Sequence, residues 1–244
     1  MNAEMLLKEG RRRAFEPPTN PQIKIWHYMD FTRLVNMLEE GGLFFRRADS
    51  FTDRFEGTMS QPVRDFLQGG HERISSEEYG QLIRRVRASS FVNCWHMNES
   101  ESAAMWKLYS SASEQSICIQ STYARLREAL AEDVNLGTVK YISYDRDHIP
   151  FDDLWWPLLH KRKSFEYERE LRAVWSDMES LHNSSKPRAA GVWRKVNLQE
   201  LVESVYVSAE AHSWFLQLVK KVLRRYGTKL DVRQSDLADE PLFD

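Results

Sequence analysis

The sequence has only two cysteines, Cys94 and Cys118, among its 244 residues. Two cysteines are too few for a disulfide framework or a cysteine-rich zinc site. No apolar run approaches the ~20 residues of a membrane-spanning helix. The first fifteen residues also lack the apolar segment of a secretory signal. These absences lead us to expect a cytoplasmic protein.

An excess of charge of one sign is also missing. Lys and Arg total 34 against 36 Asp and Glu, which gives a formal net charge of -2. Proteins that bind nucleic acid backbones usually carry a clear basic excess, so this balance does not favour nucleic acid as the partner. Local basic clusters do occur, at Arg11–Arg13, Arg84–Arg87 and Lys161–Lys163. Clusters of this kind most often lie on solvated helix faces.

Motifs for phosphate and metal binding are absent as well. Nothing fits the Walker loop, the dinucleotide fingerprint, the His-Glu-x-x-His zinc helix or the Gly-x-Ser-x-Gly elbow. The seven histidines are scattered without metal-ligand spacing. Asp49, Asp53 and Glu56 share one segment, but three acids in a loop are more often solvated than cation-bound. We therefore predict no metal.

Aromatic residues, by contrast, are plentiful. Eight Trp, nine Tyr and twelve Phe make up 12% of the chain. Aromatic side chains fill cores, and they also line pockets for flat ligands. For any one of them a place in the core is the simpler interpretation.

Hydrophobic periodicity predicts short strands interspersed with helices. The expected helices are Thr32–Glu40, Glu77–Arg87, Ser100–Tyr109, Ser121–Leu130, Asp152–Lys161 and His212–Tyr226. The expected strands are Ile23–Met29, Leu43–Arg47, Ser89–His96, Gln115–Gln120, Thr138–Tyr144, Glu168–Trp175, Val192–Val196, Val202–Ser208 and Leu230–Arg233. Their uneven spacing indicates one α+β domain at 22–234, between an N-terminal arm (1–21) and an acidic tail (235–244).

The most informative polar segment is Glu168–Arg172. Residues two apart in a strand share a face, so the strand prediction places Glu168, Glu170 and Arg172 together. Two carboxylates on one face repel each other unless a cation lies nearby. Such a pair suits a site that handles a cation or polarises sugar hydroxyls. The alternative is that Arg172 simply neutralises Glu170.

The loop Asp49–Gly57 is a second candidate. We expect Phe51 and Phe55 to be buried, because they are aromatic, and Asp53 and Glu56 to face solvent or a ligand. The loop would then flank a cleft. The alternative is a structured turn held by local salt bridges.

A series of spaced motifs runs along most of the chain: Tyr28, Gly42–Phe45, Phe51–Gly57, Phe91–Cys94, Ala104–Trp106, Val139–Tyr141 and Tyr167–Arg172. In this order they resemble the bacterial family called domain of unknown function 2971 (DUF2971). They run from about residue 25 to about residue 208. The loop departs from that family's pattern at Thr52 and Arg54.

A weaker resemblance is to ADP-ribosyltransferases. A histidine on the first core strand (His27) and Glu168-Arg169-Glu170 are similar to that family's ribose-contacting His and Glu-x-Glu strand. The segment from Phe91 to Trp106 is similar to its nicotinamide-pocket segment, with Met105 or Trp106 where the family has a stacking Tyr. This resemblance implies a split mixed or antiparallel sheet with short flanking helices, and NAD as substrate. The implied catalytic residues are Glu170, Glu168 and His27. The implied NAD-contacting residues are His27, Tyr28, Ser100, Ser102, Trp106, Asp53 and Arg172.

Three hypotheses follow. The first is an enzyme that transfers ADP-ribose from NAD to a macromolecule or to water, chemistry that the resemblance associates with toxins and phage-defence effectors. Such cleavage needs a carboxylate near a ribose that becomes cationic, and an aromatic platform for the leaving ring. The second is a non-catalytic ligand-binding or sensor module using the same aromatic cleft. The third is a nucleic-acid-processing enzyme, which rests only on the basic clusters.

Overall fold

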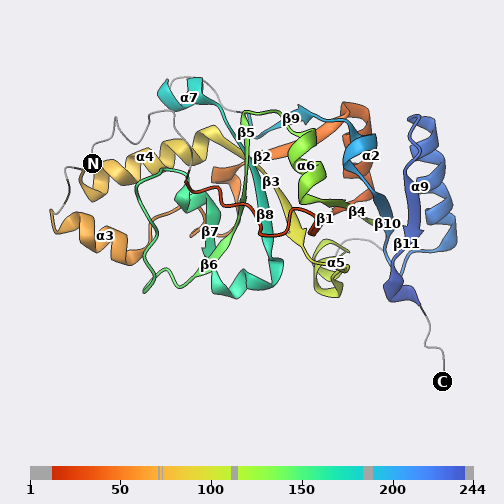
Figure 1. Ribbon diagram of the computed structural model, residues 1–244, viewed down its shortest axis with the longest axis horizontal. Coiled ribbons are helices and arrows are strands. Elements are labelled where there is room, and N and C mark those ends of the chain that lie inside the picture. Colours follow the sequence, from red (N-terminus) through yellow and green to blue (C-terminus); the bar gives the residue numbers. More distant parts are fainter. Residues whose placement is uncertain (1–12, 71, 73, 111–114, 184–188, 240–244) are drawn as a thin grey trace. The chain divides into compact units, whose positions relative to one another are not determined.

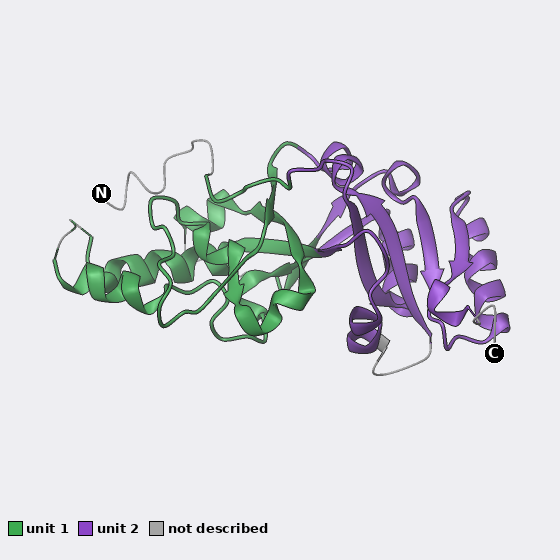
Figure 2. Ribbon diagram, turned by 60° about the horizontal axis from the view of Figure 1, so that its bottom comes forward, with its two compact units in different colours: residues 1–18, 45–94, 132–192 green, residues 19–44, 95–131, 193–244 purple. Residues whose placement is uncertain are grey.

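The structure is a computed structural model that describes residues 13–70, 72, 74–110, 115–183 and 189–239. It contains two compact units, each built from three separate stretches of chain (Figure 2). Unit 1 comprises residues 1–18, 45–94 and 132–192, and unit 2 comprises residues 19–44, 95–131 and 193–244. The predicted arm and tail lie partly outside the described residues, at 1–12 and 240–244. The single domain at 22–234 stays a prediction.

Unit 2 is organised around strand β4, whose seven residues are all buried. Strand β1 pairs with it antiparallel along its whole length, from Lys24 opposite Thr122 to Asp30 opposite Ser116. On the other edge, β4 pairs antiparallel with β10, which pairs in parallel with β11. The strands of this unit are β1 (Lys24–Asp30), β4 (Ser116–Thr122), β10 (Ser204–Val207) and β11 (Asp231–Gln234).

Several helices of unit 2 contact these strands. Helix α2 begins where the Asp30 carboxylate accepts a hydrogen bond from Arg33 N at 2.8 Å, and it ends at Gly41 in the left-handed conformation. Helix α9 lies beside β11 (Figure 1). The helices are α2 (Phe31–Glu40), α5 (Ala103–Ser110), α6 (Tyr123–Ala129), α8 (Leu198–Leu201), α9 (Ser213–Arg225) and the 3-10 helix η4 (Asp236–Ala238).

Unit 1 contains a second set of paired strands. Strands β5 and β8 pair antiparallel from Val134 opposite Trp175 to Thr138 opposite Leu171, and short strands β6 and β7 pair in parallel. The strands are β5 (Val134–Thr138), β6 (Lys140–Ile142), β7 (His160–Arg162) and β8 (Glu170–Ser176). Strands β2 (Gly42–Arg47), β3 (Ser90–Met97) and β9 (Gly191–Lys195) contribute residues to both units.

The longest helix of unit 1 is α4, which begins with a capping box. Ser75 Oγ accepts from Glu78 N, and the Glu78 carboxylate accepts from Ser75 N, so two backbone donors at the helix start are satisfied. Helix α4 contacts α3, α7 and η1. The helices are α3 (Gln61–Gln68), α4 (Ser76–Ser89), α7 (Met178–His182), η1 (Ala48–Ser50), η2 (Trp156–Leu159) and η3 (Lys163–Glu168).

The α+β class with mixed strand pairing is confirmed, although some predicted elements are wrong. The predicted helix Asp152–Lys161 is instead turns, the short η2 and β7. The predicted strand Thr138–Tyr144 is split between β5 and β6. Helical spacing in the segment His212–Tyr226 predicts that Leu218 faces inward, but Leu218 is 36% exposed on α9. In the described ranges, no helix combines the length and the apolar character needed to cross a membrane.

Candidate functional site

Three carboxylates of unit 1 meet around the ammonium of Lys161. Its Nζ lies 2.5 Å from Glu168 Oε2, 3.1 Å from Glu170 Oε1 and 3.3 Å from Glu56 Oε1. Arg172 completes the group, which we call the buried ion cluster: Glu56, Lys161, Glu168, Glu170 and Arg172. Their side chains are between 1% and 15% exposed. These charges are held largely away from water, so their mutual interactions are strong.

Each nitrogen of the Arg172 guanidinium donates a hydrogen bond, two of them to carboxylates of this cluster. Its Nε donates to Glu170 Oε2 at 2.6 Å, and its Nη2 donates to Glu56 Oε2 at 2.6 Å. The third contact runs from Nη1 to the carbonyl oxygen of Leu158 at 2.7 Å. Arg172 therefore contacts Glu170, as the alternative in which Arg172 simply neutralises that carboxylate requires. The predicted shared face of these two residues on β8 is confirmed.

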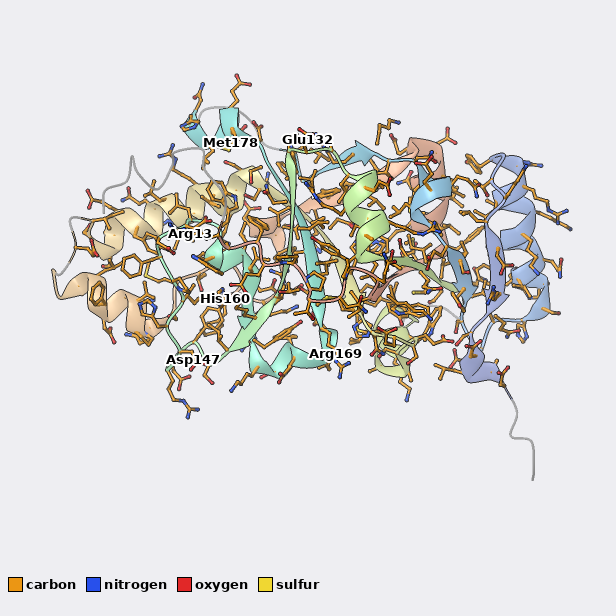
Figure 3. All side chains as sticks on the ribbon, viewed as in Figure 1. Arg13, Glu132, Asp147, His160, Arg169 and Met178 are labelled. Carbon is orange, nitrogen blue, oxygen red and sulfur yellow. The ribbon has the colours of Figure 1, made fainter. Side chains whose placement is uncertain are left out.

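Backbone geometry explains how residues 161, 168 and 170 come together. After β7 the chain forms the 3-10 helix η3, reverses at Arg169 (φ 40°) and enters β8 at Glu170 (Figure 3). Glu168 is therefore the last residue of η3 and not part of the strand, which corrects the predicted start of this strand. The phenol oxygen of Tyr141 accepts a hydrogen bond from Glu170 N at 2.8 Å and anchors the start of β8.

The two glutamates of the Glu-x-Glu pattern have opposite acid–base character. Burial, together with the hydrogen bond to Glu170 and the charge of Glu170, raises the pKa of Glu168 from 4.5 to about 7. Burial would also raise the pKa of Glu170, but Arg172 and Lys161 outweigh it and lower that pKa to about 2. The pKa of Lys161 is raised, because Glu170 and Glu56 overcome the effect of burial. Near neutral pH, Glu168 can therefore gain or lose a proton, whereas Glu170 stays an anion.

The loop before α3 differs from its prediction. Asp53 and Glu56 are buried, whereas Phe55 is 43% exposed, so the expected inside and outside are reversed at these positions. Asp53 accepts from Arg162 Nε at 3.0 Å and from Phe55 N at 3.2 Å. Ion pairing makes the burial of these acids tolerable, since each has an arginine partner.

In unit 2, the predicted ligand-contacting aromatic residues form a hydrogen-bonded core cluster. Tyr28 Oη accepts from Ser102 N at 2.8 Å, and its ring meets Trp106 edge to face at 5.2 Å. Trp106 is 4% exposed, and its Nε1 donates to Glu101 Oε2 at 2.6 Å. Glu101 also accepts from Asp236 N at 2.7 Å. A stacking role for Trp106 would need an open ring face.

The remaining predicted residues of unit 2 are His27 and Ser100. The half-buried His27 lies on β1, with its ring 5.2 Å from that of Trp95. Ser100 is exposed and lies before α5, which begins at Ala103 and not at Ser100 as predicted. Ser102 Oγ accepts from Met105 N at 3.4 Å, the contact expected of a cap. The roles of His27, Tyr28, Ser100, Ser102 and Trp106 toward NAD stay predictions.

The structure thus gathers Glu168, Glu170 and Arg172 in unit 1, while the other predicted group belongs to unit 2. Sequence reasoning did not place two members of the buried ion cluster, Lys161 and Glu56, among the site residues, although it expected Glu56 to face solvent or a ligand. Lys161 was assigned to a solvated basic cluster, yet its side chain is 7% exposed. No local pattern marks it, because its partners come from η3, β8 and a distant loop.

Two comparisons with known proteins found no match: no protein-family model fits the chain, and no curated protein matches it. The resemblance to DUF2971 therefore stays a prediction. Within the described stretches, His, Cys, Asp and Glu side chains form no group of three or more suited to a metal ion.

The comparison with solved structures found DarT from Thermus sp. 2.9. Its complex with ADP-ribosylated ssDNA has 11% sequence identity and a TM-score of 0.43, and the match covers 94% of this chain and 100% of that chain. Its complex with NAD+ has 13% identity and a TM-score of 0.39, with 92% and 100% covered. Its complex with carba-NAD+ has 10% identity and a TM-score of 0.39, with 90% and 97% covered.

Proposed function

We propose that this protein cleaves the N-glycosidic bond of NAD+ and transfers ADP-ribose to a macromolecule or to water. One observation carries the proposal: the hydrogen-bonded carboxyl pair Glu168 and Glu170, whose pKa values of about 7 and about 2 differ widely. Two neighbouring carboxyl groups with separated pKa values are typical of acid–base division of labour in active sites.

The chemistry of the bond explains why this pair fits. When nicotinamide leaves, positive charge develops on the ribose, and a fixed carboxylate such as Glu170 stabilises it. Glu168 can accept the proton of the attacking hydroxyl group or water, because a pKa of about 7 suits a general base at neutral pH. Glu170 would thus assist the departure of nicotinamide, and Glu168 would assist the attack of the acceptor.

The net charge of the buried ion cluster supports the same proposal. With Glu168 protonated, the charges of Glu56 and Glu170 balance those of Lys161 and Arg172, so the cluster is formally neutral. Ionisation of Glu168 leaves an excess of one negative charge. A cationic ribose beside the cluster favours that ionised form, so charge development and proton acceptance assist each other.

The test is NAD+ turnover by the Glu170→Gln variant, followed as nicotinamide release. Glutamine keeps the shape but removes the charge, and loss of one such electrostatic group typically lowers the rate by about 10²–10³. Glu168→Gln should lower hydrolysis less, in keeping with a role toward the acceptor. Wild-type turnover by Glu170→Gln would overturn the proposal.

Glu56→Gln is the matched control for stability. It removes a second carboxylate that contacts both Lys161 and Arg172, but it lies outside the Glu168–Glu170 pair. Both variants should be destabilised by about 2 kcal/mol, the scale of a buried charged hydrogen bond. Only Glu170→Gln should also lose turnover, measured under conditions where both proteins are folded.

A non-catalytic binding or sensor module is the second candidate. The observation that favours it is the contact of Glu170 with both Lys161 and Arg172, which neutralises the carboxylate and ties its oxygens to the protein. In that case calorimetry would show wild-type protein binding NAD+ while no nicotinamide is released. An acceptor, and a role in toxicity or phage defence, stay predictions of the sequence resemblance.

A further inference from the structure

Unit 1 also contains an open groove with a volume of about 480 Å³ whose lining is strongly basic. Four arginines line it: Arg54 from a loop, Arg64 from α3, and Arg84 and Arg87 from α4. Asp145 is the one acidic residue among the described residues of the lining, and it pairs with Arg146 at 3.3 Å. The buried ion cluster contributes no residue to this lining.

Carboxylates of the described residues neutralise the arginines of the groove only weakly. Among the described residues, Arg54 and Arg64 form no side-chain hydrogen bond or ion pair. Arg84 meets Glu77 at 3.4 Å, but both side chains are more than half exposed, so the pair is weak. Arg87 Nε is buried without a hydrogen-bond partner in the described part of the chain. Uncompensated positive charges repel one another, and an anion in the groove would relieve that repulsion.

Two glycines shape the groove around the arginines. Gly57 has a φ of 70°, and a Cβ atom there would lie 2.8 Å from the Arg87 side chain, so only glycine lets the loop pass Arg87 this closely. Gly80 on α4 lies four residues before Arg84, and a Cβ atom there would lie 3.3 Å from Met59 Cε and 3.6 Å from Arg84 Nη1. At both positions glycine therefore lets the wall of the groove pack closely around an arginine side chain.

An exposed aromatic ring adds a second kind of contact. Phe55 lines the groove and is 43% exposed, while its edge packs against Tyr144 with ring centroids 5.2 Å apart. Arg162, which is not part of the lining, lies over the Phe55 ring at 4.9 Å and occupies one face of it, so a base would stack on the other face. Planar bases stack on exposed aromatic rings of this kind.

We propose that this groove binds a nucleotide unit, with its phosphate on the arginines and its base against Phe55. Guanidinium groups bind phosphate oxygens in bidentate geometry, and a groove of this volume accommodates a drug-sized ligand. A free nucleotide and a nucleotide within a single strand present the same chemistry. A base-paired duplex does not, because its bases are not free to stack on Phe55. This site needs none of the proposed NAD+ chemistry.

The test is fluorescence anisotropy of labelled oligo-deoxythymidine of about twelve nucleotides, within the range of known single-strand site sizes. The full chain is used without NAD+. The double variant Arg64→Gln/Arg84→Gln should bind about tenfold more weakly or worse and show a shallower dependence on salt. Phe55→Leu should weaken binding by roughly tenfold with the salt dependence unchanged, because it removes stacking but no charge. Competition by deoxythymidine monophosphate separates a free-nucleotide site from a strand-binding site.

Arg224→Gln/Arg225→Gln is the control variant. It removes the same charge from exposed positions of α9, which does not line the groove. Its binding should match that of the wild type. The proposal is overturned if neither probe binds, if the control weakens binding as much as the groove variant, or if Phe55→Leu binds as the wild type does. The last result would show a general basic surface without a nucleotide site.

Discussion

The ammonium of Lys161 lies 3.1 Å from Oε1 of Glu170, and both side chains are buried. Glu168 and Glu56 also contact that ammonium, so one cation serves three carboxylates. Lys161 is therefore central to the buried ion cluster. Desolvating these charges costs free energy that only their mutual attraction offsets, so loss of a single member has a large effect.

We expect Lys161→Met to lower the free energy of unfolding by about 3–5 kcal/mol, the usual effect of breaking a buried ion pair. Glu56 and Glu170 would then share Arg172, Glu168 would lose its contact with the ammonium, and repulsion among the carboxyl groups would disfavour folding. Denaturant unfolding gives the measurement. Lys163→Met is the matched control, since Lys163 is exposed on η3 and should change stability by no more than about 0.5 kcal/mol. Equal stability of both variants would contradict the role of Lys161.

A second variant distinguishes charge imbalance from lost packing. If imbalance dominates, adding Glu168→Gln to Lys161→Met removes one of the three crowded carboxylates and recovers part of the lost stability. The double variant would then be more stable than the sum of the single effects, which a double-mutant cycle measures directly. Simple additivity would mean that packing of the lysine stem is what matters.

The raised pKa of Glu168 predicts a pH dependence of stability. Its folded pKa of about 7 exceeds the ordinary 4.5, so the folded protein holds the proton more tightly than the unfolded chain. The contribution of Glu168 is therefore fully present below about pH 4.5 and is lost as pH rises toward 7. The contribution of Glu170 to stability has the opposite pH dependence. Because its pKa is lowered to about 2, Glu170 stabilises the folded protein above pH 4.5, and this contribution is lost as pH falls toward 2.

The measurement is unfolding free energy against pH for the wild type and Glu168→Gln. Burial lowers the pKa of His160 below its ordinary 6.5, so His160 contributes a pH dependence in the opposite direction. Subtracting the two curves removes this shared contribution. We expect the difference to change between pH 4.5 and 7 and to level off above. A difference that is flat across this interval would contradict the raised pKa.

The elements that sequence predicts well are those with local signals. Helix α2 has the capping residue Asp30 and the stop at Gly41, and α4 has apolar residues at helical spacing behind a capping box. The segment Asp152–Lys161 fails because its apolar residues fill the core of unit 1 from turns and not from a helix face. The reversal at Arg169 also lacks a signal, since its left-handed conformation occurs without glycine.

The site was predictable only in part for the same reason. Alternation along a strand correctly pairs Glu170 with Arg172, because that contact is local. Glu56 reaches Arg172 across 116 residues of sequence, and no single-sequence pattern encodes such a contact. The inside and outside of the loop were reversed because hydrophobicity alone places Phe55 in the core, whereas ion pairing draws Asp53 inward.

The tight approach of Gly57 to Arg87 gives the last prediction. Gly57→Ala places a methyl group where a Cβ would lie 2.8 Å from Arg87, at a φ of 70° that alanine adopts only with strain. The strain alone costs about 1–2 kcal/mol. Gly70→Ala measures the cost of backbone strain alone, since Gly70 has a φ of 71° and its Cβ would meet nothing within 4 Å. We therefore expect Gly57→Ala to be the more destabilising of the two.

The destabilisation of Gly57→Ala beyond that of Gly70→Ala should vanish when Arg87 is shortened. In Gly57→Ala/Arg87→Ala the side chain that the methyl group would strike is gone, so only the strain common to Gly70→Ala remains. Arg87→Ala alone supplies the reference for the lost arginine, and thermal or denaturant unfolding of the four variants completes the comparison. If Gly57→Ala costs the same with and without Arg87, steric contact is not the reason for glycine at this position, and the backbone conformation alone requires it.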